Sequence, residues 1–137
     1  MTIQPYLHFA GRADEAIAFY RNVFGAELQM LLRFEESPEP LPEGMIAKGW
    51  EGKIMHASLK IGDSVLLASD GCGSDNPGFK GFSLTYVAKD AGDADRAFTQ
   101  LADGGQIRMP LGKTFFSPRF GMVEDRFGVL WNVIVPA

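Results

Sequence analysis

The sequence of 137 residues contains one cysteine, Cys72, and this scarcity excludes two kinds of site. A single thiol cannot form an intramolecular disulfide, and Cys72 has no second cysteine with which to hold a zinc ion. With 46% hydrophobic and 22% charged residues, the composition is typical of a domain that folds without crosslinks. A reducing, cytoplasmic location is the one that this composition favours.

Long apolar runs and an excess of positive charge are also missing. No stretch reaches the roughly 18–20 apolar residues needed to cross a bilayer, and the N-terminal MTIQPYLHF lacks the basic and apolar regions of a signal peptide. The 13 Lys and Arg against 17 Asp and Glu give a net charge of −4, not the positive surface that nucleic acids require. We therefore expect a soluble protein with neither a membrane nor a nucleic acid as partner.

The hydrophobic pattern predicts the same order of elements twice. In each half, apolar residues recur at the i, i+3, i+4 and i+7 spacing of a helix after a short first strand. In the first half the expected strand, helix, strand and hairpin cover residues 3–11, 12–25, 26–34 and 53–70. In the second half the same four elements cover residues 81–87, 93–105, 105–111 and 120–135. Each half is thus expected to form a curved sheet backed by one helix.

This repeat predicts an α+β fold built from two tandem βαβββ modules. We place the modules at about residues 1–70 and 80–137, joined by a linker over residues 71–79, and expect them to pack as a single domain of residues 1–137. The stretch 35–53 lies outside the repeat and is acidic and rich in Pro and Gly, as long surface loops are. It is either a solvated excursion or a lid over a site, with apolar contacts from Met45, Ile46 and Trp50.

The last predicted strand contains one polar side chain in apolar surroundings. Alternation along LWNVIV puts Asn132 between Leu130 and Ile134 on one face, while the other face is wholly apolar. A buried amide without a hydrogen-bond partner costs roughly 1–3 kcal/mol. We therefore expect Asn132 to meet another residue, a water or a ligand.

The repeat and several of its segments resemble a known family. The repeated unit, with AIAFYRNVFGAEL after its first strand and VEDRFGVLWNVIV at the end, resembles a superfamily, and four segments resemble one family within it. The segments similar to the PhnB-like family are PYLHFAG, MHASLKIGDSVLLASD, GFSLTYV and RFGMVEDRFGVLWNV. That family belongs to the vicinal oxygen chelate superfamily of glyoxalases, bleomycin-resistance proteins and dioxygenases. The resemblance covers nearly the whole chain. It implies two concave half-barrels around a cleft, commonly assembled as a homodimer.

The resemblance also implies four strand positions at which metal-dependent members hold a divalent ion with His or Glu. In this sequence those positions correspond to Pro5, Leu67, Phe82 and Asn132. None of them is His or Glu, so we expect no metal cofactor, with Asn132 keeping a polar group in the cleft. Phe82 would fill the space of the ion and form the floor of a pocket.

Both histidines lie on predicted strands, and alternation assigns them to different faces. In MHASLKI every second residue is apolar and is expected to face the helix, so His56 and Ser58 are expected to face the cleft. His56 is then either a catalytic base or substrate-binding group, or a histidine held by structural hydrogen bonds. His8 is expected to face the helix layer beside Tyr6, with a structural role.

Other polar candidates come from loops and strand ends. Arg119, in KTFFSPRFG, could clamp a carboxylate or phosphate beside an apolar wall of Phe115 and Phe116, or it could be a surface arginine. Asp70 ends the strand LLASD and either caps the following loop or orients a catalytic group. The sequence contains no phosphate loop, dinucleotide fingerprint or nucleophile elbow.

The leading hypothesis is a homodimeric protein that binds a small molecule in a largely apolar cleft. His56 is the candidate catalytic residue, and the candidate ligand-binding residues are Ser58, Phe82, Phe116, Arg119 and Asn132. The protein either sequesters its ligand or performs metal-free proton chemistry with His56 as base. One alternative is a metal-dependent lyase, isomerase or dioxygenase with a site rebuilt from His56 and Glu51 or Asp70. Another is an interaction module that binds no small molecule.

Overall fold

The computed structural model describes residues 1–73 and 78–137. The chain divides into two compact units, Met1–Asn76 and Pro77–Ala137, which we call unit 1 and unit 2. Unit 1 contains β1 (Tyr6–His8), α1 (Ala13–Phe24), β2 (Glu27–Arg33), the short 3-10 helix η1 (Phe34–Glu36), β3 (Ile54–Ile61) and β4 (Ser64–Ser69). Unit 2 contains β5 (Leu84–Val87), α2 (Ala91–Ala102), β6 (Gln106–Gly112), β7 (Phe120–Glu124) and β8 (Leu130–Ile134).

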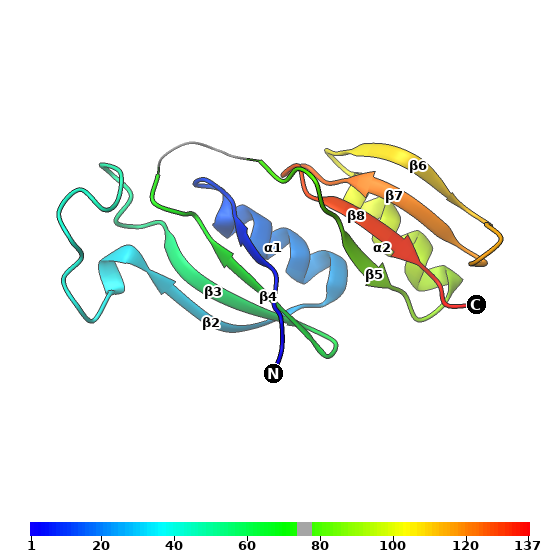
Figure 1. Cartoon of the computed structure of the whole chain (residues 1–137), viewed down its shortest axis with the longest axis horizontal. Coiled ribbons are helices and arrows are strands. Elements are labelled where there is room, and N and C mark those ends of the chain that lie inside the picture. Colours follow the sequence, from blue (N-terminus) through cyan, green and yellow to red (C-terminus); the bar gives the residue numbers. More distant parts are fainter. Residues whose placement is uncertain (74–77) are drawn as a thin grey trace. The chain divides into compact units, whose positions relative to one another are not determined.

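Unit 1 is a mixed sheet with one helix across one face (Figure 1). Its strands lie in the order β1-β4-β3-β2, with β1 parallel to β4 and the other neighbours antiparallel. The helix-facing side chains Ala57, Leu59 and Leu66 are buried, as is the apolar stripe of α1. Gly25 ends α1 with φ of 63°, a left-handed conformation that glycine adopts without strain.

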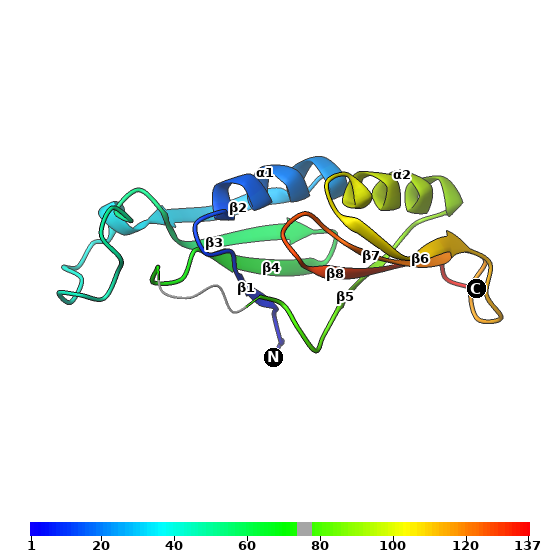
Figure 2. The same cartoon turned by 90° about the horizontal axis from the view of Figure 1, so that it is seen from above.

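Unit 2 repeats this topology, and Figure 2 shows α2 lying on one side of its own sheet. The strand order is β5-β8-β7-β6, with β5 parallel to β8. The buried residues Val123, Trp131 and Val133 form the face that packs on α2. No helix within the described ranges is long and apolar enough to cross a membrane. The predicted α+β fold of two βαβββ modules is therefore confirmed.

Several element boundaries differ from the sequence expectations, and those of α2 and β5 matter most for the positions of the candidate residues. α2 begins at Ala91, earlier than expected, because the Asp90 carboxylate accepts a hydrogen bond from the N–H of Asp93 at 2.8 Å and caps the helix. β5 begins only at Leu84, which leaves Phe82 before the strand. Within the predicted linker, residues 74–77 lie outside the described residues, and the packing of both units as one domain stays a prediction.

Asp70 is a buried carboxylate that ties three backbone segments of unit 1 together. Its Oδ1 accepts hydrogen bonds from the N–H groups of Gly11 at 2.9 Å and Ala13 at 2.8 Å, and its Oδ2 accepts one from Ile54 at 2.9 Å. Asp70 therefore caps the start of α1, where Arg12 provides no side-chain cap. The expectation that it caps the following loop was wrong, because β4 pairs with β1 and brings Asp70 to the turn before α1.

A polar contact in unit 2 joins β5 to α2. Tyr86 Oη donates to Asp93 Oδ2 at 2.7 Å, and Arg96 Nη2 donates to Asp93 Oδ1 at 3.0 Å. Burial and the neighbouring carboxylate raise the pKa of Tyr86 to about 12. Burial of Asp93 opposes its ionisation, but hydrogen bonds from Tyr86, the Lys89 N–H and Arg96 outweigh burial and lower the pKa of Asp93.

This contact is expected to make stability fall at alkaline pH. The pKa of Tyr86 is 10.0 when unperturbed and about 12 in the fold, so its stabilising contribution is complete below pH 10 and is lost as the pH rises toward 12. Denaturant unfolding of the wild type and Tyr86→Phe, from about pH 8 to about pH 11, checks this. The difference in free energy of unfolding between the wild type and Tyr86→Phe should become smaller as the pH rises. A difference that stays constant would contradict the raised pKa of Tyr86.

Candidate functional site

Each sheet has one face that its helix does not cover, and we call these the open faces. Strand register aligns four open-face residues across unit 1, in the order Tyr6, Leu67, Ser58 and Met30. The corresponding row of unit 2 is Thr85, Asn132, Met122 and Met109. The rows run over equivalent strands, so the repeat places Asn132 at the position that Leu67 occupies in unit 1.

His56 lies on the open face of unit 1 in contact with Tyr6. Tyr6 Oη and His56 Nδ1 are 2.9 Å apart, and the two rings meet edge to face with centroids 5.4 Å apart. His56 and Ser58 are half-buried and alternate with the helix-facing Ala57 and Leu59. The alternation inferred from the sequence is thus the one that the strand adopts, while the roles of His56 and Ser58 stay predictions.

His8 also lies on the open face, and the expectation that it faces the helix layer was wrong. Its ring stacks on Tyr6 with centroids 4.9 Å apart and an interplanar angle of 15°. Leu7 and Phe9 are the residues buried on the helix side, at 2% and 5% exposed. Because β1 has only three residues, its buried middle residue decides which neighbours turn outward.

Asn132 finds its partners on the neighbouring strand segment of unit 2. Its Nδ2 donates to Ser83 Oγ at 2.9 Å and to Thr85 Oγ1 at 3.2 Å. The register explains the contact, since Thr85 lies directly opposite Asn132. The amide expected to need a partner is therefore held by two hydroxyl groups.

The Asn132 amide keeps further hydrogen-bonding capacity. Its Oδ1 has no hydrogen-bond partner among the described residues. Hydroxyl groups both donate and accept, so the same pair of hydroxyls would also hold the amide turned over. Met122 lies opposite on β7, and Leu130 and Ile134 flank Asn132 along β8. A ligand on this apolar face would meet either a carbonyl oxygen or an amino group.

Arg119 forms an ion pair with Asp95 on the helix-covered side of the sheet in unit 2. Its Nη2 donates to both carboxylate oxygens of Asp95 on α2, at 2.7 and 2.9 Å. Its Nε is buried and has no hydrogen-bond partner within residues 1–73 and 78–137. Because α2 covers the face opposite to Asn132, the structure does not bring Arg119 and Asn132 together.

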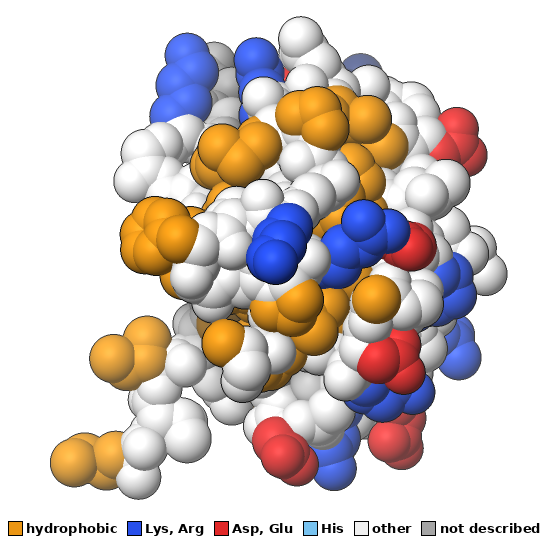
Figure 3. All heavy atoms as spheres, turned by 90° about the vertical axis from the view of Figure 1, so that its right-hand side faces the viewer, with side chains coloured by type: hydrophobic (Ala, Val, Ile, Leu, Met, Phe, Trp, Pro, Cys, Tyr) orange, Lys and Arg blue, Asp and Glu red, His pale blue; other side chains and the backbone are white. Residues whose placement is uncertain are grey.

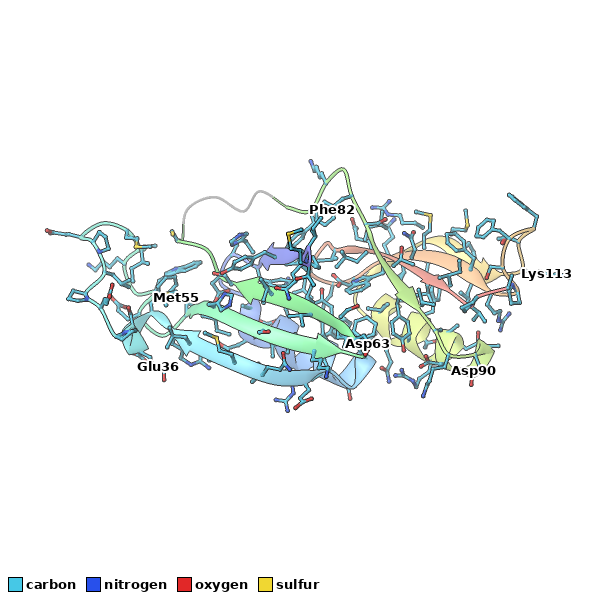
Figure 4. The ribbon with its side chains drawn as sticks, turned by 60° about the horizontal axis from the view of Figure 1, so that its bottom comes forward. Glu36, Met55, Asp63, Phe82, Asp90 and Lys113 are labelled. Carbon is cyan, nitrogen blue, oxygen red and sulfur yellow. The ribbon has the colours of Figure 1, made fainter. Side chains whose placement is uncertain are left out.

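The aromatic candidates lie in two parts of unit 2, beside the open face and in the segment that precedes β5. Phe116 packs edge-on against Phe120, centroids 5.0 Å apart, and Phe120 lies opposite Ile134 on the open face of unit 2. Phe115 is 99% exposed, and Figure 3 shows hydrophobic side chains among charged ones at this end of unit 2. Phe82 is 46% exposed and lies in the segment leading into β5 (Figure 4). Phe116 thus extends the open face, and Phe82 lies outside the strand.

The residues present do not fit the divalent site that the resemblance implies. The register places Tyr6 beside Leu67 and Thr85 beside Asn132, so these residues, rather than Pro5 and Phe82, occupy the paired positions. None carries a carboxylate or imidazole. Within residues 1–73 and 78–137, no three His, Cys, Asp or Glu side chains lie close enough to hold a metal.

The loop over residues 35–53 is anchored to unit 1 near its end. The Trp50 ring lies 3.5 Å from where a Cβ on Gly11 would be, and the Ala47 N–H donates to the Cys72 carbonyl at 2.9 Å. Trp50 therefore packs on the turn before α1. A lid formed by the preceding part of the loop stays a prediction.

Comparisons with known proteins find relatives along nearly the whole chain. The model of the Glyoxalase/Bleomycin resistance protein/Dioxygenase superfamily matches residues 2–133. Protein YjdN of Escherichia coli strain K12 is 36% identical, over 98% of this chain and 95% of YjdN. The crystal structure of protein PA1353 from Pseudomonas aeruginosa is 41% identical with a TM-score of 0.87, covering 99% of this chain and 98% of that one.

The similarity extends to a PhnB protein. The structure of PhnB from Bacillus cereus is 29% identical with a TM-score of 0.82, covering 98% of this chain and 99% of that one. The sheets and helices of that structure thus match those of this chain. The chain belongs to the glyoxalase/bleomycin resistance protein/dioxygenase superfamily and is related to PhnB and YjdN, as its segments indicated.

Proposed function

We propose that the protein binds a small organic molecule through the polar groups of its open faces, without a divalent metal. One observation carries this proposal. His56 and Asn132 each keep a hydrogen-bonding atom that has no partner among the described residues, namely His56 Nε2 and Asn132 Oδ1. Binding sites for small molecules are mostly apolar and contain a few such groups that fix the ligand's orientation.

The surroundings of these groups support the proposal. In unit 1, Leu32 pairs with His56, and Leu67 pairs with Ser58. In unit 2, Met122 pairs with Asn132. Polar groups set in apolar surroundings give a ligand both area to bury and a direction for its hydrogen bonds.

The donor set supports a site that does not depend on a metal. The paired positions carry Tyr6, Leu67, Thr85 and Asn132, and neutral hydroxyl and amide groups are weak ligands for the ions that His and Glu bind. A site rebuilt around Asp70 is disfavoured because both of its carboxylate oxygens already accept backbone hydrogen bonds. His56 would then act through hydrogen bonding or proton transfer alone.

Substitution of Asn132 tests the placement of the ligand. A compound that stabilises the wild type in a thermal-shift screen of metabolites should bind Asn132→Leu about tenfold more weakly, because one hydrogen bond of about 1.4 kcal/mol is lost. Calorimetric titration of the wild type, Asn132→Leu, His56→Ala and the control Asn22→Ala measures the affinities. Asn22 is an exposed residue of α1 and should leave binding unchanged. Wild-type affinity in both open-face variants would refute the placement, and a screen without any stabilising compound would favour an interaction module.

We also propose that the protein works as a homodimer in the cytoplasm. Met30, Val87 and Met109 are between 43% and 60% exposed on the open faces, and apolar surface of this kind is usually covered in solution. Light scattering should give twice the chain mass of 15.0 kDa. A monomer at micromolar concentration would contradict the dimer. The lone thiol of Cys72 supports the reducing location.

A further inference from the structure

The contact between Tyr6 and His56 bears on which ring nitrogen of His56 carries its proton. We propose that Tyr6 holds neutral His56 in the form protonated at Nε2, so that His56 offers an N–H donor to the open face of unit 1. The ligand would then be one that presents a hydrogen-bond-accepting oxygen or nitrogen, such as a carbonyl. This ligand class rests on the proposed function, whereas the assignment of the proton does not.

The phenol of Tyr6 is held in place from two sides. It stacks on His8 at 4.9 Å and meets the edge of His56 at 5.4 Å. Its backbone is fixed by the pairing of Tyr6 with Leu67, whose own partner is Ser58, two residues from His56. The separation of 2.9 Å between Oη and Nδ1 is therefore set by three neighbouring strands. Tyr6 acts as a positioning residue for the His56 ring.

The chemistry of the two groups decides the direction of the hydrogen bond. A neutral imidazole has one donor and one acceptor nitrogen, and a phenol both donates and accepts. If Oη donates to Nδ1, the imidazole proton resides on Nε2, which has no hydrogen-bond partner among the described residues. In the reverse arrangement Nδ1–H would donate to the phenol oxygen, so the weaker of the two donors would meet the weaker of the two acceptors. The first arrangement pairs the stronger donor, the phenol, with the stronger acceptor, the imidazole nitrogen, across the 2.9 Å separation, and we therefore assign it.

This assignment changes what His56 can do. A resting Nε2–H group donates a hydrogen bond to a ligand, and Nε2 cannot remove a proton from one until its own hydrogen has been replaced by one on Nδ1. Nδ1 retains a lone pair, but that lone pair is already directed at Tyr6. His56 therefore orients an acceptor atom of the ligand in the resting protein, and a base at Nε2 requires the Tyr6 contact to rearrange.

Nitrogen NMR on the full chain tests the assignment without any ligand. The protein has only two histidines, so the His56→Gln variant identifies the His56 signals. At a pH where the ring is neutral, we expect an unprotonated Nδ1 and a protonated Nε2. In Tyr6→Phe the two nitrogen shifts should move toward each other as both forms become populated, whereas Tyr86→Phe in unit 2 should leave them unchanged. A protonated Nδ1 in the wild type, or an unchanged pattern in Tyr6→Phe, would overturn the proposal.

The ligand class is tested separately from the proton. A stabilising compound that carries a carbonyl should lose about tenfold in affinity when its carbonyl is replaced by a methylene, and His56→Ala should bind both compounds equally. Equal binding of the two compounds by the wild type would overturn the ligand class and leave the proton assignment standing. If Nδ1 carries the proton in the wild type and ligand binding still depends on His56, the proton assignment is overturned and the proposed function stands.

Discussion

Replacement of Asp70 by asparagine is expected to lower the free energy of unfolding by about 3 kcal/mol. The carboxylate accepts three backbone hydrogen bonds in a buried position, at 2% exposure. An asparagine oxygen could still accept from Gly11 and Ala13, but its amino group would then face the N–H of Ile54. Two donors would meet in the core, and the start of α1 would lose the charge that stabilises a helix N-terminus.

Asp63→Asn is the matched control for this prediction. Asp63 is exposed in the turn between β3 and β4 (Figure 4), and the same chemical change there should alter stability by less than about 0.5 kcal/mol. Urea unfolding of both variants measures the difference. An Asp70→Asn protein as stable as Asp63→Asn would mean that the buried carboxylate does not hold the turn before α1.

The second large effect is expected at Gly105, between α2 and β6. A Cβ at this position would overlap the carbonyl oxygen of Glu124 and lie 3.0 Å from the backbone of Asp125. Gly105→Ala must therefore separate the start of β6 from the end of β7. Overpacking of this kind typically costs about 1–3 kcal/mol.

Gly112 provides a control at the other end of the same strand. A Cβ there would meet no atom of the described residues within 4 Å, and neither glycine has a positive φ. Gly112→Ala should therefore match the wild type in thermal unfolding, while Gly105→Ala melts at a lower temperature. Equal melting temperatures for the two variants would show that β6 can shift at no cost.

The fold was predictable because its signals are local. Period-two alternation and the helical spacing of apolar residues lie within single elements, and the same order appears twice in the chain. The boundary of α2 was missed because the capping role of Asp90 depends on the backbone conformation at one residue. Asp70 was misjudged because the two partners that place it at the start of α1 are 57 and 59 residues away along the chain.

The candidate site was predictable in part for the same reason. The face of Asn132 follows from alternation, but its hydroxyl partners follow from the parallel register of β5 and β8, which no local pattern contains. Arg119 pairs with Asp95 through tertiary packing across 24 residues. Tyr6 was assigned with His8 to the helix layer, although the sequence held a signal against this: an apolar Leu7 between two polar aromatic residues, Tyr6 and His8, is typical of a strand with one buried face.

Elemental analysis combined with native mass spectrometry, on protein purified without a metal-affinity tag, tests the central claim most directly. The claim is that the open faces bind a small molecule with His56 and Asn132 and without a divalent metal. We expect well under one divalent ion per chain and a retained small molecule whose occupancy falls in His56→Ala and Asn132→Leu. One divalent ion per chain that is lost in His56→Ala, or a retained molecule indifferent to both substitutions, would contradict it.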